Sequence, residues 1–139
     1  VLQIEAPEGP LQVVARGGRR FRVTRWLEED AYPQAEVEFL DTFDAGDVPG
    51  EELVITEQVV RETLEYLREL DLSLPWPTDI ELAEDPVEKV WQLAGISPLG
   101  TLDHQDLLSL DNPSVLIEQI RLTVSEALET FKMDRGSGS

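Results

Sequence analysis

The fold is decided by residues 11–40, which contain the stretches Arg20-Phe-Arg-Val-Thr-Arg-Trp-Leu27 and Gln34-Ala-Glu-Val-Glu-Phe39. The first stretch alternates, with Phe21, Val23 and Leu27 on one side and Arg20, Arg22, Thr24 and Trp26 on the other. A half-buried strand requires this period of two, because successive side chains leave opposite faces of a sheet. Arginines of the first strand can face Glu36 and Glu38 of the second, which would help to fix an antiparallel register.

Two further strands are predicted before this pair, over residues 1–6 and 11–15. Pro7-Glu-Gly-Pro10 has the composition of a turn and would join them as a hairpin. Gly17 and Gly18 would form the next turn, which gives a four-stranded antiparallel meander. Four strands do not close a barrel, so one edge is expected to stay open unless more of the chain covers it.

The rest of the chain has helical periodicity. A helix is predicted over residues 53–70, and a second begins at Asp85, which would cap it, and ends at Gly95. A short helix capped by Asp103 follows over residues 103–110, and Asn112 caps the last one. We therefore expect an antiparallel β portion over residues 1–50 and a helical bundle over residues 51–133. Residues 134–139 are expected to be a disordered tail or an added linker.

The net charge of −18 over 139 residues is the strongest property of the composition. Such a surface repels nucleic-acid phosphate and anionic membranes, so neither is expected as a partner. The sequence has no cysteine, no apolar run near the ~18 residues of a membrane span and no signal-peptide pattern, and we expect a cytoplasmic protein.

Five of the eleven basic residues, Arg16, Arg19, Arg20, Arg22 and Arg25, lie within ten positions. One interpretation is that they pair with neighbouring acids such as Glu36 and Glu38. The other is a patch that binds an anion or an acidic peptide.

Catalytic motifs are missing from the sequence. There is no phosphate-binding loop and no nucleophile elbow, and the two lysines, Lys89 and Lys132, fall on polar helix faces. His104 is the only histidine, and with Asp103 and Asp106 it fits helix capping and solvent exposure better than a metal site, which would recruit more nitrogen or sulfur ligands. We predict no catalytic residue, no cofactor and no metal.

The three tryptophans have different settings. Trp91 lies on the apolar stripe of a helix and is predicted to be core. Trp26 falls on the polar side of its strand, which is unusual unless something covers it. Trp76 lies between two prolines in a loop, where an aromatic side chain either anchors a contact or packs under the helices.

Several short motifs together resemble the N-terminal substrate-binding (LON) domain of the ATP-dependent Lon proteases, in its stand-alone bacterial form. They are the Pro7-Glu8-Gly9 turn, Gly17 to Val23, Tyr32 to Glu38, Asp85-Pro86, and Leu99 to Leu108 with Asp103-His-Gln-Asp-Leu-Leu108. The similarity covers roughly residues 1–133. The family's domain has an earlier stretch, typically with an L-P-L-F-P signature, which this sequence lacks, so the chain is expected to be the latter part of the domain.

The resemblance implies an α+β fold, in which an antiparallel, PUA-like β-barrel portion precedes a C-terminal helical bundle. It also implies a non-catalytic module that binds unfolded or partly folded polypeptides and is linked to ATP-dependent proteolysis. Trp26, Tyr32 and Trp76 are the candidate polypeptide contacts, and an open sheet edge could accept an extended peptide. The alternative is a self-assembly module that forms a homo-oligomer. An enzyme and an RNA-binding protein are further alternatives, which the missing motifs and the negative charge disfavour.

Overall fold

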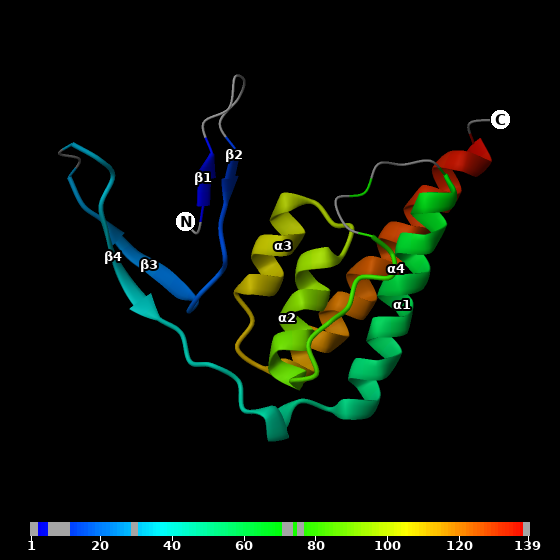
Figure 1. Cartoon of the computed structure of the whole chain (residues 1–139), viewed down its shortest axis with the longest axis horizontal. Helices are drawn as coiled ribbons and strands as arrows, with labels where there is room; N and C mark the ends of the chain where they lie inside the picture. Colours follow the sequence, from blue (N-terminus) through cyan, green and yellow to red (C-terminus); the bar gives the residue numbers. More distant parts are fainter. Residues whose placement is uncertain (1–2, 6–11, 29–30, 71–73, 75–76, 138–139) are drawn as a thin grey trace. The chain divides into compact units, whose positions relative to one another are not determined.

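The computed structural model describes residues 3–5, 12–28, 31–70, 74 and 77–137. The chain is α+β and divides into two units, Val1–Thr42 with the strands and Phe43–Ser139 with the helices (Figure 1). Residues 43–50, which were expected to belong to the β portion, thus lie in the unit with the helices.

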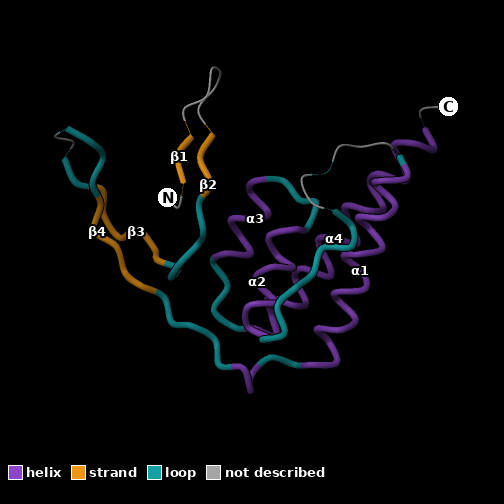
Figure 2. Tube along the Cα trace, viewed as in Figure 1, coloured by secondary structure: helices purple, strands orange, loops and turns teal. Residues whose placement is uncertain are grey.

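The strands form two antiparallel pairs (Figure 2). β1 (Gln3–Glu5) pairs with β2 (Gln12–Val14), and β3 (Phe21–Trp26) pairs with β4 (Ala35–Phe39). The predicted four-stranded meander is wrong for the described residues, since β2 and β3 are not hydrogen-bonded neighbours. The six residues 15–20 separate these two strands, whereas a tight hairpin uses a two-residue turn. The predicted Pro7-Glu8-Gly9-Pro10 turn lies outside the described residues.

The β3–β4 pair carries a bulge at Thr24. Val23 lies opposite Val37, but the next matched pair is Arg25 with Glu36, so β3 has one residue more than its partner at this point. The hydroxyl of Thr24 donates a hydrogen bond to the Glu36 carbonyl oxygen at 3.2 Å. A bulge of this kind leaves one residue outside the ladder and changes the parity of those that follow.

The bulge moves Trp26 to the apolar face of the hairpin. Residues directly opposite each other in an antiparallel pair share a face. Trp26 lies opposite Ala35, and therefore on the same side as Val37 and Phe39. The prediction that Trp26 falls on the polar face is wrong, because it assumed an unbroken alternation along the strand. The predicted arrangement of arginines opposite glutamates is confirmed, with Arg22 opposite Glu38 and Arg25 opposite Glu36.

The second unit begins with a short 3-10 helix, η1 (Ala45–Asp47), and contains four α-helices. They are α1 (Gly50–Glu69), α2 (Pro86–Ile96), α3 (Thr101–Leu108) and α4 (Pro113–Ser137). α4 continues through residues 134–137, which were predicted to lie in a disordered tail. A helix that is already nucleated extends at one hydrogen bond per added residue, so a long α4 can absorb this polar end.

α2 and α4 each pack against the other three helices of this unit, and the most extensive helix contact is the one between α1 and α4. α4 runs beside α1 in the same direction (Figures 1 and 2): Arg121 pairs with Glu52 near the start of α1, and the Lys132 ammonium lies over the Tyr66 ring farther along. The buried core side chains are Val48, Leu53, Val60, Leu64, Val90, Leu93, Ala94, Ile96, Leu107, Leu116, Ile117, Ile120 and Val124. The predicted apolar stripes therefore face one another, and Trp91 is partly buried against this core.

Two of the predicted helix caps are confirmed. The Asp85 carboxylate accepts a hydrogen bond from the Glu88 backbone N–H at 3.0 Å, and the Asn112 side-chain oxygen accepts from Ser114 and Val115 at the start of α4. The predicted Asp103 cap is wrong, because α3 begins at Thr101 after Gly100 and Asp103 lies in its first turn. α2 also extends one residue past Gly95.

The connection between α1 and α2 is tied to α1 by a partly buried arginine. The Arg61 guanidinium donates hydrogen bonds to the carbonyl oxygens of Thr78 at 3.1 Å and Ile80 at 2.9 Å. Glu57 lies 3.9 Å from Arg61 and 3.7 Å from the Lys89 ammonium of α2. Hydrogen bonds from Arg61 thus hold this irregular segment against α1.

Candidate functional site

The β3–β4 hairpin presents an exposed apolar face. The cross-strand register places Phe21, Val23 and Trp26 on the same side as Ala35, Val37 and Phe39. The exposed fraction is 70% for Trp26, 55% for Phe21 and 54% for Phe39, and Val37 is also exposed. Contiguous apolar side chains of this size, left in water, mark an interaction surface more often than scattered ones do. We refer to these six residues as the hairpin face.

One end of the hairpin face is organised by aromatic contacts. The Phe21 and Phe39 rings meet edge to face, with their centroids 6.5 Å apart. The Arg19 guanidinium lies over the Phe39 ring, 4.5 Å from its centroid. Such contacts hold aromatic side chains in defined positions without burying them, so the rings stay available to a partner.

The opposite side of the hairpin is polar and partly self-paired. Arg25 and Glu36 form an ion pair at 2.7 Å, and both side chains are more than half exposed. Arg20 donates a hydrogen bond to the Asp41 carbonyl oxygen at 3.2 Å. For Arg25, the ion pair supports the interpretation that the arginines pair with acids of the hairpin. An anion-binding role for the arginine cluster stays a prediction. An exposed pair of this kind contributes little stability, but it helps to fix which face is polar.

Two of the three predicted contact residues belong to the β3–β4 hairpin. Trp26 ends β3, and Tyr32, which is 64% exposed, lies in the connection from β3 to β4. Trp76 lies outside the described residues. Phe21, Val37 and Phe39 were not among the predicted contacts, because alternation in the sequence predicts a buried face and does not indicate whether that face stays exposed.

No cluster of three or more His, Asp or Glu side chains suited to a metal ion occurs in the part of the chain that the structure describes. His104 instead has a structural contact, since its Nε2 lies 2.9 Å from the Ser97 carbonyl oxygen at the end of α2. Among the described helices, none is long and apolar enough to cross a membrane.

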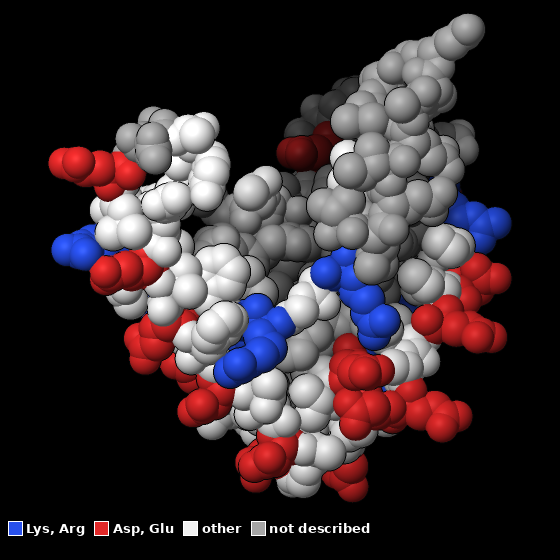
Figure 3. Space-filling model, turned by 60° about the vertical axis from the view of Figure 1, so that its left-hand side comes forward, with Lys and Arg blue, Asp and Glu red and all other residues white. Residues whose placement is uncertain are grey.

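Charge is divided unequally between the two units. Residues 1–42 hold five basic and eight acidic residues, a net charge of −3, whereas residues 43–139 hold six basic and 21 acidic residues, a net charge of −15. On the face drawn in Figure 3, acidic side chains (red) are spread widely and basic ones (blue) form small groups. The helical unit is therefore the main source of the negative field.

Comparison with known protein families identifies a match over most of the chain. The model of the family described as the ATP-dependent protease La (LON) substrate-binding domain matches residues 1–125. Both the hairpin face and most of the helical unit lie within the matched region. No curated protein matches the chain.

Proposed function

Because the chain belongs to the LON substrate-binding domain family, we propose that it recognises protein substrates and that the hairpin face is the contact surface. The observation that carries this proposal is the exposure of Trp26, Phe21 and Phe39 on one side of a two-stranded sheet. A segment of polypeptide that exposes apolar side chains would cover this face. The domain itself is non-catalytic, so it would act in recognition and would serve ATP-dependent proteolysis by holding substrates.

Trp26 is the proposed anchor. It is the most exposed aromatic residue on the hairpin face, and a bound partner would remove a large apolar area from water. Aromatic anchors dominate the energetics of many interfaces, whereas the residues around them mainly exclude water. Tyr32 would extend the surface from the adjacent connection, with its hydroxyl available for a hydrogen bond. Trp76 stays a predicted contact.

The backbone of the hairpin offers a second way to bind. β3 and β4 each have one edge without a strand partner among the described residues. An extended peptide can add to such an edge through main-chain hydrogen bonds that do not depend on its sequence. Strand addition would give the broad specificity that recognition of unfolded chains requires, and the aromatic side chains would select apolar segments.

The experiment is a titration of a fluorescently labelled, permanently unfolded polypeptide, followed by anisotropy. We expect saturable binding, and we expect Trp26→Ala to weaken it by about tenfold or more, as for a residue whose truncation costs over ~1.4 kcal/mol. Val54→Ala is the matched control, because Val54 is an exposed apolar residue on α1, outside the hairpin. Absence of saturable binding at tens of micromolar, or an equal loss in both variants, would refute the proposal.

The same exposed edges favour a second candidate function, which is self-assembly. Two copies of the chain could pair their hairpins edge to edge or cover each other's hairpin faces, since both surfaces are self-complementary. Light scattering over a dilution series separates the two functions. A chain that stays monomeric while it binds polypeptide excludes assembly, and a Trp26-dependent dimer without polypeptide binding excludes the first proposal.

The PUA-like barrel also belongs to this proposal. Two antiparallel hairpins are elements that such a barrel would use, and the family match supports it. We propose that the hairpin face becomes part of that barrel's surface and not of its interior. Hydroxyl-radical footprinting tests this, because interior placement would protect the Trp26 and Phe39 rings from oxidation.

A further inference from the structure

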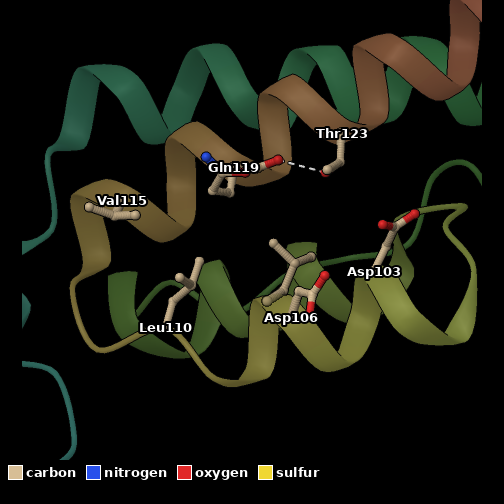
Figure 4. Close-up of a pocket in the computed structure, with 7 residues that line it drawn as sticks. Asp103, Asp106, Leu110, Val115, Gln119 and Thr123 are labelled. Carbon is tan, nitrogen blue, oxygen red and sulfur yellow. Dashed lines mark hydrogen bonds between the residues drawn. The ribbon is translucent and has the colours of Figure 1, made fainter.

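A cavity of about 160 Å³ lies between α3 and α4, and nothing above assigns it a role (Figure 4). One part of its lining is apolar and comes from Leu107, Leu110 and Val115. The other part is polar and comes from Asp103 and Asp106 on α3 and from Gln119 and Thr123 on α4. All seven lining residues belong to the helical unit.

The two carboxylates are placed to receive a cation. Asp103 and Asp106 are three residues apart on α3, a spacing that puts side chains on one face of a helix. Neither forms an ion pair with a described residue, although other carboxylates of this unit do. The Thr123 hydroxyl donates its hydrogen to the Gln119 carbonyl oxygen at 2.6 Å, which leaves its lone pairs as acceptors. The polar lining thus offers oxygen acceptors and favours a donor with positive charge.

The size and the apolar lining restrict the occupant further. Pockets for nucleotides and other drug-sized ligands occupy about 300–1,000 Å³, so this cavity suits something nearer to a single side chain. Leucine and valine side chains on one wall would contact methylene groups, while the carboxylates would contact a charged end. A lysine side chain has both parts, a flexible four-carbon stem and a compact ammonium group with three donors.

We propose that this cavity binds the side chain of a lysine from a protein substrate, with its ammonium group between Asp103 and Asp106. Its stem lies against Leu107, Leu110 and Val115. The net charge of −15 on the helical unit concentrates basic chains around the site. This inference rests on the proposed function only for the source of the lysine, since no residue that lines the cavity belongs to the hairpin face.

The first measurement uses n-butylammonium chloride as the probe, titrated into the ¹⁵N-labelled chain and followed by NMR. We expect saturable shifts of the Leu107, Gln119 and Thr123 amides. n-Butanol, which has the same stem without the charge, is expected to bind about five- to tenfold more weakly, as for the loss of two exposed ion pairs. Shifts that do not saturate, or equal affinities for the two probes, would overturn the proposal.

Variants distinguish binding in the cavity from attraction to the net negative charge of the helical unit. Asp103→Asn with Asp106→Asn is expected to reduce butylammonium affinity to that of butanol. Glu126→Gln with Glu129→Gln changes the net charge equally on an exposed part of α4 away from the cavity and is expected to leave the affinity unchanged. Val115→Phe is expected to fill the cavity and abolish binding without a change of charge. Equal losses in the two double variants would show attraction to net charge only and would overturn the site.

A second experiment tests whether the cavity binds a lysine that is part of a polypeptide. An apolar peptide with one lysine is compared with the same peptide carrying norleucine, and we expect the lysine to gain about five- to tenfold in affinity, a gain that Asp103→Asn/Asp106→Asn removes. A gain that persists in this variant would overturn the assignment. If the chain does not bind unfolded polypeptide, butylammonium is still expected to bind to the cavity. If the cavity does not bind lysine, the Asp103→Asn/Asp106→Asn variant is still expected to bind unfolded polypeptide through Trp26.

Discussion

At the scale of single residues, the core of the helical unit contains an unusual hydroxyl. Thr56 of α1 is fully buried, and its Oγ1 atom has no hydrogen-bond partner among the described residues. Thr63, about two helical turns further along α1, is equally buried, but its hydroxyl donates to the Val59 carbonyl oxygen at 2.8 Å. A buried polar group without a partner loses its hydration and gains nothing in return. The two threonines are therefore a matched pair with opposite energetic roles.

We expect Thr56→Val to stabilise the protein by about 1 kcal/mol, because it replaces an unsatisfied hydroxyl by a methyl group of similar size. The measurement is the midpoint of urea unfolding. Thr63→Val is the control, and its effect is expected to be smaller or destabilising because a hydrogen bond is lost. A clear loss of stability in Thr56→Val would show that the hydroxyl has a partner in solution, such as a bound water.

At the scale of elements, local side-chain chemistry decides where helices begin. Asn112 accepts hydrogen bonds from two backbone N–H groups of α4, at 2.8 Å and 3.2 Å, whereas Asp103 caps nothing in α3. We expect Asn112→Ala to lower the free energy of unfolding by about 1 kcal/mol. Asp103→Ala should cost only a few tenths, since it removes a charge near the start of a short helix. Equal losses, measured by denaturant unfolding, would contradict the assignment of Gly100 as the cap of α3.

The bulge in β3 gives a second prediction for an element. A variant that lacks Thr24 removes the extra residue, so Val23, Arg25 and Trp26 would follow one another with regular alternation. We expect the pairs of Arg25 with Glu36 and Trp26 with Ala35 to persist, and cross-strand NOEs should report them. Deletion of Glu38 is the control, because it shifts Phe39 by one position against β3 and is expected to abolish the cross-strand NOE between Phe21 and Phe39. Loss of the pairs in the Thr24 deletion would mean that the bulge is required for the hairpin.

The sequence allows the helices and the antiparallel pairing to be predicted, because both depend on near neighbours. Asp85 and Asn112 are caps that act within three residues, and the stripe of Leu116, Ile117 and Ile120 is a property of one helix. The bulge could not be predicted, since Val23-Thr24-Arg25 contains no glycine or proline and the extra residue is defined only by the partner strand. The same limit applies to the candidate site. Trp26 was identified as unusual, but Phe21 and Phe39 were expected to be buried.

At the scale of the whole molecule, the core belongs to one unit. Every residue of the buried cluster lies between Val48 and Val124, and no described side chain of residues 1–42 belongs to it. A helical unit that buries its own apolar stripes has the requirements for independent folding, while two isolated hairpins are marginal in water. We therefore expect the helical unit to supply most of the free energy of unfolding.

We expect the fragment of residues 43–139 to fold alone and to unfold cooperatively on heating, with a helical circular dichroism spectrum. The fragment of residues 1–42 is expected to give no cooperative transition, because each sheet formed by its described residues has two strands. The intact chain is the control, and its transition should occur close to that of the helical fragment. A helical fragment that is unfolded at all temperatures would show that the hairpins supply stability that the core does not reveal.

The stacked rings of Phe43 and Trp91 fix the start of the helical unit. Phe43 is the first residue of the helical unit, and its ring stacks on Trp91 of α2 with centroids 5.4 Å apart and planes inclined by 18°. The contact attaches the first residue of this unit to α2, seven positions before α1 begins at Gly50. The direction in which the chain enters the bundle is therefore set by an aromatic pair and not by the start of α1.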